Sequence, residues 1–330
     1  MNKFKHGGDV ASFAKEQGIK KKEVIDLSSN INYIKPRYKV KPDLKNYPKY
    51  DELYKAISKR YKIERNQFEI FNGGSSAIFS FFKHLKVRDL TIYSPAYLEY
   101  KKAGEIFGFD IHHINRLKDI YKKPKKGSLV VFVNPSTPDG RLYDLKKLFK
   151  IWKEQRNIVF IDESFLDFTK GKSGAKFLKD YKKLYILKSL TKFYSSAGTR
   201  VGIIVSNRKN IEKIKYKEPL WKISNFDSLY FAQVLNQIDF IKKTIKSTKK
   251  NRKILKKVLI KSKFIKKLHT SKANFVLAKV KGTSVKKLEK KLAKRNIMVR
   301  NCSNFDFLDK KYLRFAVKRE QDMRILKGVL

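Results

Sequence analysis

Two glycines and two serines stand directly before an apolar stretch of helical character. The segment Gly73-Gly74-Ser75-Ser76 precedes the mostly apolar residues 77–85. Such a turn places unhindered backbone N–H groups and hydroxyls at the positive end of a helix, an arrangement that suits a phosphate. Glycine turns before helices are common, so this segment indicates an anion site only together with other groups.

Polar residues also follow three predicted strands. The strand at 129–133 ends in Asn-Pro-Ser-Thr-Pro-Asp-Gly at 134–140, and the strand at 158–161 ends in Asp162-Glu163-Ser164-Phe165. The strand at 184–187 leads into Ser189-Leu190-Thr191-Lys192, with Arg200 eight residues further on. Ligands of open α/β sheets bind at the carboxyl ends of the strands, so we expect these residues to form one site.

The order and spacing of these segments resemble the cofactor site of the class I/II aminotransferase superfamily, over nearly the whole chain. The resemblance implies pyridoxal 5'-phosphate as the cofactor and Lys192 as the catalytic, Schiff-base lysine. It also implies the α/β architecture of PLP-dependent transferase fold type I. In that fold a large domain holds a mostly parallel seven-stranded sheet, and a smaller domain is of the α+β class.

The chemistry of two residues agrees with this resemblance. A buried carboxylate such as Asp162 can hold a pyridine nitrogen protonated, which makes the ring an electron sink. Lys192, desolvated and near cations, should have a lowered pKa, so that its amine is available as a nucleophile. Either residue alone would be read as a turn residue or a surface lysine. Their conjunction favours a cofactor site.

The resemblance assigns roles to further residues. Gly74, Ser75, Ser189 and Arg200 would bind the cofactor's phosphate. Asn134 would bond the ring's phenolic oxygen, and Tyr97 would stack on the ring. Tyr47 matches a tyrosine that reaches the phosphate in the neighbouring subunit, so a homodimer is expected.

The ends of the chain resemble one family within the superfamily, the threonine-phosphate decarboxylases of cobalamin biosynthesis. The resemblance rests on His-Gly-Gly-Asp at 6–9, on residues 26–32, and on residues 300–305 and 313–317. It implies that Arg314 binds the substrate carboxylate and that His6, Asn30 and Arg300 surround the substrate phosphate, with Asn134 also at the substrate. Residues 162–168 carry Phe where histidinol-phosphate aminotransferases usually carry Tyr.

The implied reaction is decarboxylation of L-threonine O-3-phosphate to (R)-1-aminopropan-2-yl phosphate. Asp9, Asn301 and Tyr33 depart from the family's usual Asn, Asp and Pro, which leaves the substrate side chain open. L-Serine O-phosphate, giving ethanolamine phosphate, is therefore a second substrate candidate. Histidinol-phosphate aminotransferase is the alternative activity, because it shares the cofactor site and also uses a phosphorylated amine.

The elements that must position these residues alternate between strands and helices, which is typical of a parallel sheet wrapped by helices. Apolar, β-branched runs predict strands at 90–93, 109–114, 129–133, 158–161, 184–187 and 201–205. Amphipathic stretches predict helices near 75–86, 96–107, 144–155 and 207–216. We assign residues 41–225 to the large cofactor-binding domain.

The remaining segments are expected to form the small domain, from residues 1–40 and 226–330. Its predicted elements are a long helix at 226–261, strands at 264–269, 273–280, 297–300 and 312–317, and a helix near 284–295. A short helix follows Asp9 as N-cap and stops at Gly18. This N-terminal segment should pack with the C-terminal unit.

The formal charge of +49 raises a different class of function, a basic nucleic-acid-binding protein. Its lysines are spread as pairs over almost every predicted helix, which favours a solvated basic surface without a specific nucleic-acid site. Cys302 is the only cysteine and the five histidines fit no metal spacing, so no metal site is expected. The sequence has no signal-like start and no membrane-spanning run, which favours a cytoplasmic protein.

Overall fold

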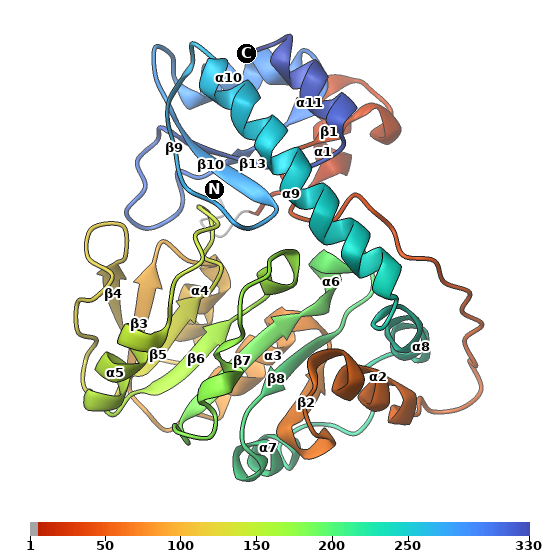
Figure 1. Cartoon of the computed structure of the whole chain (residues 1–330), viewed down its shortest axis with the longest axis vertical. Helices are drawn as coiled ribbons and strands as arrows, with labels where there is room; N and C mark the ends of the chain where they lie inside the picture. Colours follow the sequence, from red (N-terminus) through yellow and green to blue (C-terminus); the bar gives the residue numbers. More distant parts are fainter. Residues whose placement is uncertain (1–5) are drawn as a thin grey trace.

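The computed structural model describes residues 6–330, and its largest element is a seven-stranded sheet (Figure 1). The strand order is β2-β8-β7-β6-β5-β3-β4. Only β8 runs antiparallel to its neighbours, so the sheet is mostly parallel, as predicted. The strands are β2 (Phe68–Phe71), β3 (Asp89–Ser94), β4 (Asp110–Asn115), β5 (Leu129–Val133), β6 (Ile158–Asp162), β7 (Leu184–Ser189) and β8 (Gly202–Val205).

Helices cover both faces of this sheet, and every residue of β5 is buried as a result. This explains why the central strands read as continuous apolar runs. The helices are α2 (Asp51–Tyr61), α3 (Gly73–Lys83), α4 (Leu98–Ile106), α5 (Lys146–Glu154), the one-turn α6 (Leu190–Phe193), α7 (Arg208–Lys215) and α8 (Asn225–Val234). Short 3₁₀ turns lie at η1 (Lys21–Glu23), η2 (Arg65–Gln67), η3 (Leu166–Phe168) and η4 (Gly174–Phe177).

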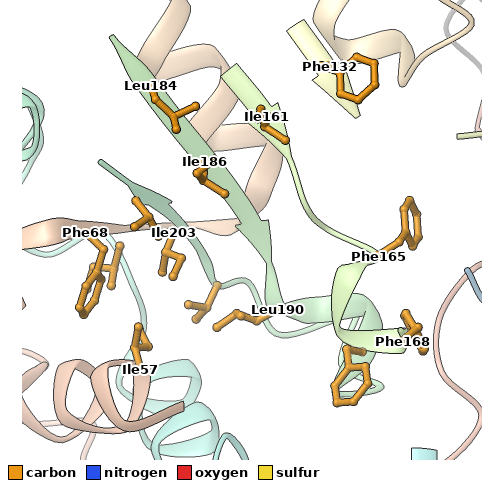
Figure 2. Packing of buried hydrophobic residues seen from close by; sticks show 14 of the residues in the cluster. Ile57, Phe68, Phe132, Ile161, Phe165, Phe168, Leu184, Ile186, Leu190 and Ile203 are labelled. Carbon is orange, nitrogen blue, oxygen red and sulfur yellow. The ribbon is translucent and has the colours of Figure 1, made fainter. Parts of the chain in front are cut away.

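The core between the sheet and α2 is built from branched aliphatic and aromatic side chains (Figure 2). Ile186 of β7 and Ile203 of β8 face the same side as Phe68 of β2, and Ile57 of α2 packs there too. All four are fully buried. Burying one such side chain stabilises the fold by roughly 1.5–3 kcal/mol, so this layer holds the strand ends in fixed positions.

The second unit follows the long helix α9 (Ile238–Lys261), which runs from the large sheet to the smaller one (Figure 1). Its antiparallel sheet has the order β12-β13-β10-β9. The elements are β9 (Ile265–Leu268), β10 (Phe275–Val280), α10 (Val285–Ala293), β11 (Ile297–Met298), β12 (Arg300–Asn301), β13 (Tyr312–Ala316) and α11 (Glu320–Lys327).

The N-terminal segment contacts this second unit. Helix α1 (Val10–Gln17) begins after Asp9, whose carboxylate accepts the backbone N–H of Ser12, and ends at Gly18 in the left-handed conformation. Strand β1 (Ile25–Asp26) then pairs in parallel with β11. The boundaries placed after residues 40 and 225 remain a prediction.

The structure corrects the sequence prediction in several places. The predicted continuous helix at 226–261 is two helices, because the chain breaks between α8 and α9, where Asn236 donates to the carbonyl of Ala56. The predicted strand at 297–300 is divided into β11 and β12. Strand β2 and helix α2 were not predicted; the buried Glu69 interrupts the apolar pattern of β2.

Candidate active site

A cavity of about 350 Å³ opens at the carboxyl ends of the large sheet's strands and reaches the second unit. Among the described residues, its lining includes every predicted site residue except Asn134 and Tyr47. Those that line it are His6, Asn30, Gly74, Ser75, Tyr97, Asp162, Ser189, Lys192, Arg200, Arg300 and Arg314. Of these, Gly74, Ser75, Asp162, Ser189, Lys192 and Arg200 come from the polar segments at the strand ends, whereas His6, Asn30, Arg300 and Arg314 were assigned from the family resemblance.

One end of the cavity is a cradle of close-packed backbone. Gly73 opens α3 with a positive φ of 81°, and a Cβ there would lie 2.7 Å from Nη2 of Arg200. A Cβ on Gly202 would lie 2.8 Å from the backbone of Gly73. Only glycine fits at these two positions. The positive end of α3 and the guanidinium of Arg200 thus face the same space, which suits an anion.

Hydroxyl groups complete this end of the cavity. Ser75 Oγ lies 3.4 Å from the phenolic oxygen of Tyr97, and Ser189 Oγ lies 3.2 Å from the hydroxyl of Thr191. The Ser189 side chain also packs against Gly74: a Cβ added to Gly74 would lie 3.2 Å from the Cβ of Ser189. These hydroxyls can donate to oxyanion oxygens.

Lys192 lies in the one-turn helix α6 that directly follows β7. Its Nζ is 3.4 Å from Ser189 Oγ. Burial lowers the pKa of Lys192 below its usual value; the nearby guanidinium groups of Arg200 and Arg314 lower it further, against the opposing effect of Asp162. The amine is therefore more readily neutral than that of a surface lysine, and a neutral amine is the nucleophilic form.

Asp162 ends β6 and lies buried at the base of the cavity. Its Oδ1 accepts the backbone N–H of Ser164 at 2.8 Å, and its Oδ2 accepts the hydroxyl of Tyr100 at 2.9 Å. Tyr100 was not among the predicted site residues. Its position on the predicted helix at 96–107, one turn after Tyr97, is the signal that would have found it.

Two arginines of the second unit face the cavity from the opposite side. Arg314 of β13 donates to the carbonyl of Ser28 at 3.0 Å and to Thr137 Oγ1 at 3.3 Å. In the amide orientation that satisfies its neighbours, Asn30 accepts from Arg314 at 3.0 and 3.3 Å. Burial lowers the pKa of Arg314 to about 10. At neutral pH this guanidinium is still charged.

Arg300 of β12 is the second buried guanidinium. It donates to Asn304 Oδ1 at 2.8 Å and to the carbonyl of Asn301, and its guanidinium carbon lies 5.3 Å from the ring centre of Phe305. Burial lowers its pKa. Arg300 and Arg314 are opposite each other on the adjacent strands β12 and β13, so two positive charges line the cavity together.

The start of the described chain, residues 6–8, lines the cavity. His6 Nε2 is 2.9 Å from a carboxylate oxygen of Glu99 in α4, and its ring centre is 5.3 Å from that of Tyr97. Gly7 packs so closely on the carbonyl of Ser28 that a Cβ would lie 2.9 Å from it. The residues predicted at the N-terminus therefore reach both units.

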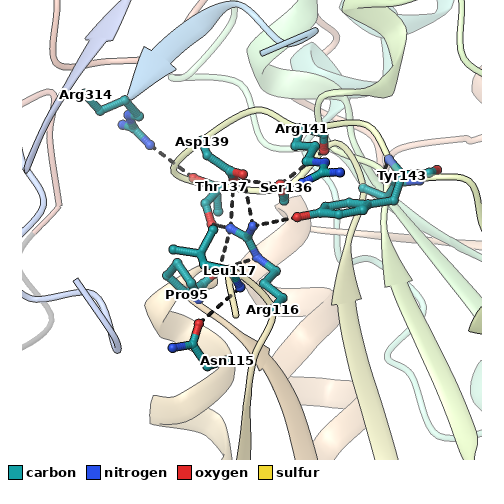
Figure 3. A network of polar contacts seen from close by, with 11 residues as sticks. Pro95, Asn115, Arg116, Leu117, Ser136, Thr137, Asp139, Arg141, Tyr143 and Arg314 are labelled. Atoms are coloured by element: carbon teal, nitrogen blue, oxygen red, sulfur yellow. Dashed lines mark hydrogen bonds and ion pairs between the residues drawn. The ribbon is translucent and has the colours of Figure 1, made fainter. Parts of the chain in front are cut away.

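Asn134 lies beside the cavity but does not line it. Its Oδ1 accepts the backbone N–H of Tyr143 at 2.9 Å and its Nδ2 donates to the carbonyl of Tyr143 at 3.1 Å. Thr137, from the same loop, lines the cavity instead and contacts Arg314 (Figure 3). Thr137 was not among the predicted site residues, because the backbone turn decides which side chain of the motif faces inward.

Tyr47 lies outside the cavity and is 70% exposed. Its ring stacks on Trp221, which is also exposed, with the ring centres 3.9 Å apart. Its predicted role in a neighbouring subunit stays a prediction. Cys302 is buried, and burial raises its pKa to about 11, so it is a poor nucleophile.

Within residues 6–330, no three His, Cys, Asp or Glu side chains are grouped so that they could hold a metal ion. The helices of the same residues include none with the length and apolar character of a membrane span.

The cavity fits pyridoxal 5'-phosphate. The glycine cradle with Arg200 suits a phosphate, the buried carboxylate of Asp162 suits a protonated pyridine nitrogen, and the amine of Lys192 suits an aldehyde.

Comparisons with known proteins agree with this geometry. The chain is 31% identical to the adenosylcobalamin biosynthesis bifunctional protein CobDQ of Leptospira interrogans; the match covers 98% of this chain but 40% of that protein's length. It is 25% identical to the threonine-phosphate decarboxylase of Salmonella typhimurium, covering 97% and 93% of the two chains. The crystal structure of histidinol-phosphate aminotransferase from Clostridium acetobutylicum superposes with a TM-score of 0.82 at 30% identity, covering 93% and 99%.

The family model of aminotransferase class I and II matches residues 22–329, nearly the whole chain. The fold, the cavity and this match lead to one conclusion. The chain belongs to the class I and II aminotransferase family, with fold type I and pyridoxal 5'-phosphate as its cofactor.

Proposed function

We propose that this protein decarboxylates a phosphorylated hydroxy amino acid. The first candidate substrate is L-threonine O-3-phosphate, which gives (R)-1-aminopropan-2-yl phosphate for cobalamin biosynthesis. L-Serine O-phosphate, which gives ethanolamine phosphate, is the second. The similarity to the threonine-phosphate decarboxylase of Salmonella typhimurium over nearly the full length of both chains supports this choice.

The observation that carries the proposal is the pair of buried guanidinium groups that line the cavity together with Lys192. Arg314 and Arg300 both line the cavity, on the same side. Guanidinium forks bind carboxylates and phosphates through paired hydrogen bonds. A phosphorylated amino acid carries one carboxylate and one phosphate within a single small molecule, so it could engage both arginines. The cavity of about 350 Å³ also suits a small substrate.

The cofactor would be held by the residues at the ends of the large sheet's strands. Gly74, Ser75, Ser189 and Arg200 would bind its phosphate, and Asp162 would pair with its pyridine nitrogen. Lys192 would bind its aldehyde carbon, and Tyr97 would cover one ring face. We keep Asn134 as the predicted partner of the phenolic oxygen, although its amide is bonded to Tyr143 in this structure.

When bound, the cofactor supplies an electron sink for the pair of electrons left by the departing carboxylate. The chain's own residues determine which bond breaks. Arg314 would hold the carboxylate at one side of the cavity, while His6, Asn30 and Arg300 would hold the phosphate. Lys192 would then donate a proton to Cα, which completes the amine product.

Histidinol-phosphate aminotransferase is the second candidate, favoured by the 30% identity to the enzyme of Clostridium acetobutylicum over almost all of both chains. In that reaction Lys192 would remove the proton from Cα, and no carboxylate would leave. The same arginines would then serve the phosphate of one substrate and the carboxylates of the other. The two reactions thus use one set of residues and differ in their products.

We also propose that the protein acts as a homodimer. Tyr47 and Trp221 form an exposed stacked pair, which is an unusual position for two large aromatic rings in an isolated subunit. In a dimer Tyr47 would reach the phosphate site of the partner subunit. The exposed pair would then be covered by protein.

A product assay separates the two reactions. Purified enzyme is incubated with L-threonine O-3-phosphate, L-serine O-phosphate or histidinol phosphate, each with and without 2-oxoglutarate. Carbon dioxide from a phosphoamino acid without 2-oxoglutarate supports the decarboxylase. Glutamate from histidinol phosphate, with no carbon dioxide from either phosphoamino acid, would assign the protein as the aminotransferase.

A further inference from the structure

Arg116 is a buried, charged residue that does not line the cavity. Filling space in the core does not explain why a charged side chain stands at this position. It follows β4 directly, and its side chain is 1% exposed, while that of its partner Asp139 is 2% exposed. Removing a guanidinium from water is costly unless every donor finds a partner. Apolar residues of similar volume would often fill such a space at least as stably. The charge therefore calls for another explanation.

All donors of Arg116 are directed at two loops (Figure 3). The first loop follows Ser94 at the end of β3, and the second follows Val133 at the end of β5. Toward the first loop, Nε and Nη2 donate to the carbonyl of Pro95 at 3.1 and 2.9 Å. Toward the second loop, Nη1 and Nη2 donate to the two carboxylate oxygens of Asp139 at 3.0 and 2.8 Å. Nη2 also donates to the carbonyl of Thr137 at 3.0 Å, and Nη1 to the hydroxyl of Tyr143 at 3.2 Å.

These two loops present side chains to the cavity. Pro95 stands two residues before Tyr97, which lines the cavity, and Thr137 itself lines it. The loops follow β3 and β5, which are neighbours in the sheet. Arg116 therefore joins the backbones of two adjacent strand ends from the side away from the cavity.

Asp139 extends this link within its own loop. Its Oδ1 also accepts the hydroxyl of Ser136 at 2.7 Å, so the carboxylate fixes the turn on both sides of Thr137. The hydroxyl of Thr137 in turn accepts a hydrogen bond from Nη1 of Arg314 at 3.3 Å. A continuous chain of contacts thus runs from Arg116 through the Thr137 loop to the guanidinium of Arg314.

We propose that Arg116, paired with Asp139, is a positioning residue that sets where Tyr97, Thr137 and Arg314 stand in the cavity. A guanidinium is suited to this task because its planar fork addresses a carboxylate and two carbonyls in fixed directions. An apolar filler would leave the two loops free to shift relative to each other. The inference rests on the proposed function only for the assignment of Arg314 to the substrate.

The test replaces Arg116 and Asp139 together by neutral residues, so that no buried charge is left without its partner. The variant Arg116→Met with Asp139→Asn is compared with Arg60→Met with Asp167→Asn, which removes a different, partly buried ion pair. The contacts of that control pair are to Tyr61 and Tyr194, neither of which lines the cavity. Both variants are measured by thermal unfolding, by KM and kcat, and by the pH at which the visible absorbance of the cofactor titrates.

The last readout depends on the charges around Lys192. Asp162, Arg200 and Arg314 all act on that nitrogen, and the arginines favour its neutral form. If Arg314 moves away after the loops are released, the pH midpoint of the absorbance rises. We expect this rise, together with an increase in KM of about tenfold over the control and a smaller change in kcat. The unfolding temperatures of the two variants should be similar.

If KM, kcat and the absorbance midpoint instead match those of the control, Arg116 serves stability alone and the proposal is wrong. Should the double variant fail to fold, Arg116→Lys provides the same test, since it keeps the charge but loses the fork. For Arg116→Lys, KM and the pH midpoint of the absorbance should lie between the wild-type values and the values expected for the double variant. If both stay at the wild-type values, the proposal is wrong. A wild type that converts no phosphorylated substrate would reject the proposed function, whereas the absorbance midpoints would still test Arg116.

Discussion

Tyr100 donates its hydroxyl to Oδ2 of Asp162 at 2.9 Å, and both side chains are buried. Burial raises the pKa of Tyr100 well above its ordinary value, and the Asp162 carboxylate adds to the effect. The phenol therefore stays protonated at neutral pH and remains a donor. It fixes one carboxylate oxygen, while the backbone N–H of Ser164 fixes the other.

We predict that Tyr100→Phe weakens catalysis without unfolding the protein. The ring packing is kept, but Asp162 loses a hydrogen bond of the kind that contributes roughly 1.5–3 kcal/mol when one partner is charged. Steady-state kinetics should show kcat/KM falling about tenfold or more. Tyr54→Phe is the matched control, because it removes a buried phenol–carboxylate bond to Glu69 away from the cavity. Equal losses in both variants would argue against a role for Tyr100 in the site.

We expect Lys192→Ala to abolish turnover and to leave a folded protein. Borohydride should fix the cofactor covalently on the wild type but not on this variant, as mass spectrometry would show. Lys209→Ala changes a lysine of α7 that does not line the cavity and should behave as the wild type. Covalent capture that persists in Lys192→Ala would place the cofactor on a different lysine.

The lowered pKa of Lys192 gives a pH dependence with a definite sign. A lysine whose folded-state pKa is below 10.5 is neutral over a wider pH range, and the neutral amine is the form that attacks an aldehyde. The rate of cofactor uptake by the apoprotein should therefore rise with pH and reach half its maximum below pH 10.5. A midpoint at or above this value would show that Lys192 is not desolvated in solution.

Arg300→Ala should separate phosphate binding from carboxylate binding. The loss of a charged, bidentate partner should cost on the order of 2 kcal/mol in transition-state binding with a phosphorylated substrate, a factor of about thirty in kcat/KM. With free threonine the loss should largely vanish. Arg314→Ala should impair both substrates, because it would remove the carboxylate partner. Equal effects of Arg300→Ala on both substrates would exclude Arg300 as the phosphate ligand.

Complementation tests the homodimer and the role of Tyr47. Lys192→Ala and Tyr47→Phe variants are each expected to have low activity, and mixing them should restore it, since one heterodimer site would contain both intact residues. Subunit exchange can be followed by size-exclusion chromatography with light scattering. A fully active monomer, or a mixture no more active than its components, would contradict the role of Tyr47 in the partner's site.

The sequence by itself determined the parallel sheet, the strands that end in polar residues, and hence the edge of the sheet where the site lies. The reason is physical: buried strands need continuous apolar runs, and parallel strands all end at one edge, so Asp162 and Lys192 had to lie near each other. The cap at Asp9 and the stop at Gly18 were equally local, because each depends on the backbone conformation of a few residues.

Only the tertiary structure decided which side chains around that edge turn inward. Thr137, not Asn134, lines the cavity, because both the oxygen and the nitrogen of the Asn134 amide are hydrogen-bonded to the backbone of Tyr143. Tyr100 contacts Asp162, and Arg116 contacts Asp139, although each pair is far apart in the sequence and no repeating pattern of residues relates its two members. Such contacts depend on how the strands and loops pack against each other, whereas a sequence pattern records only the preferences of neighbouring residues.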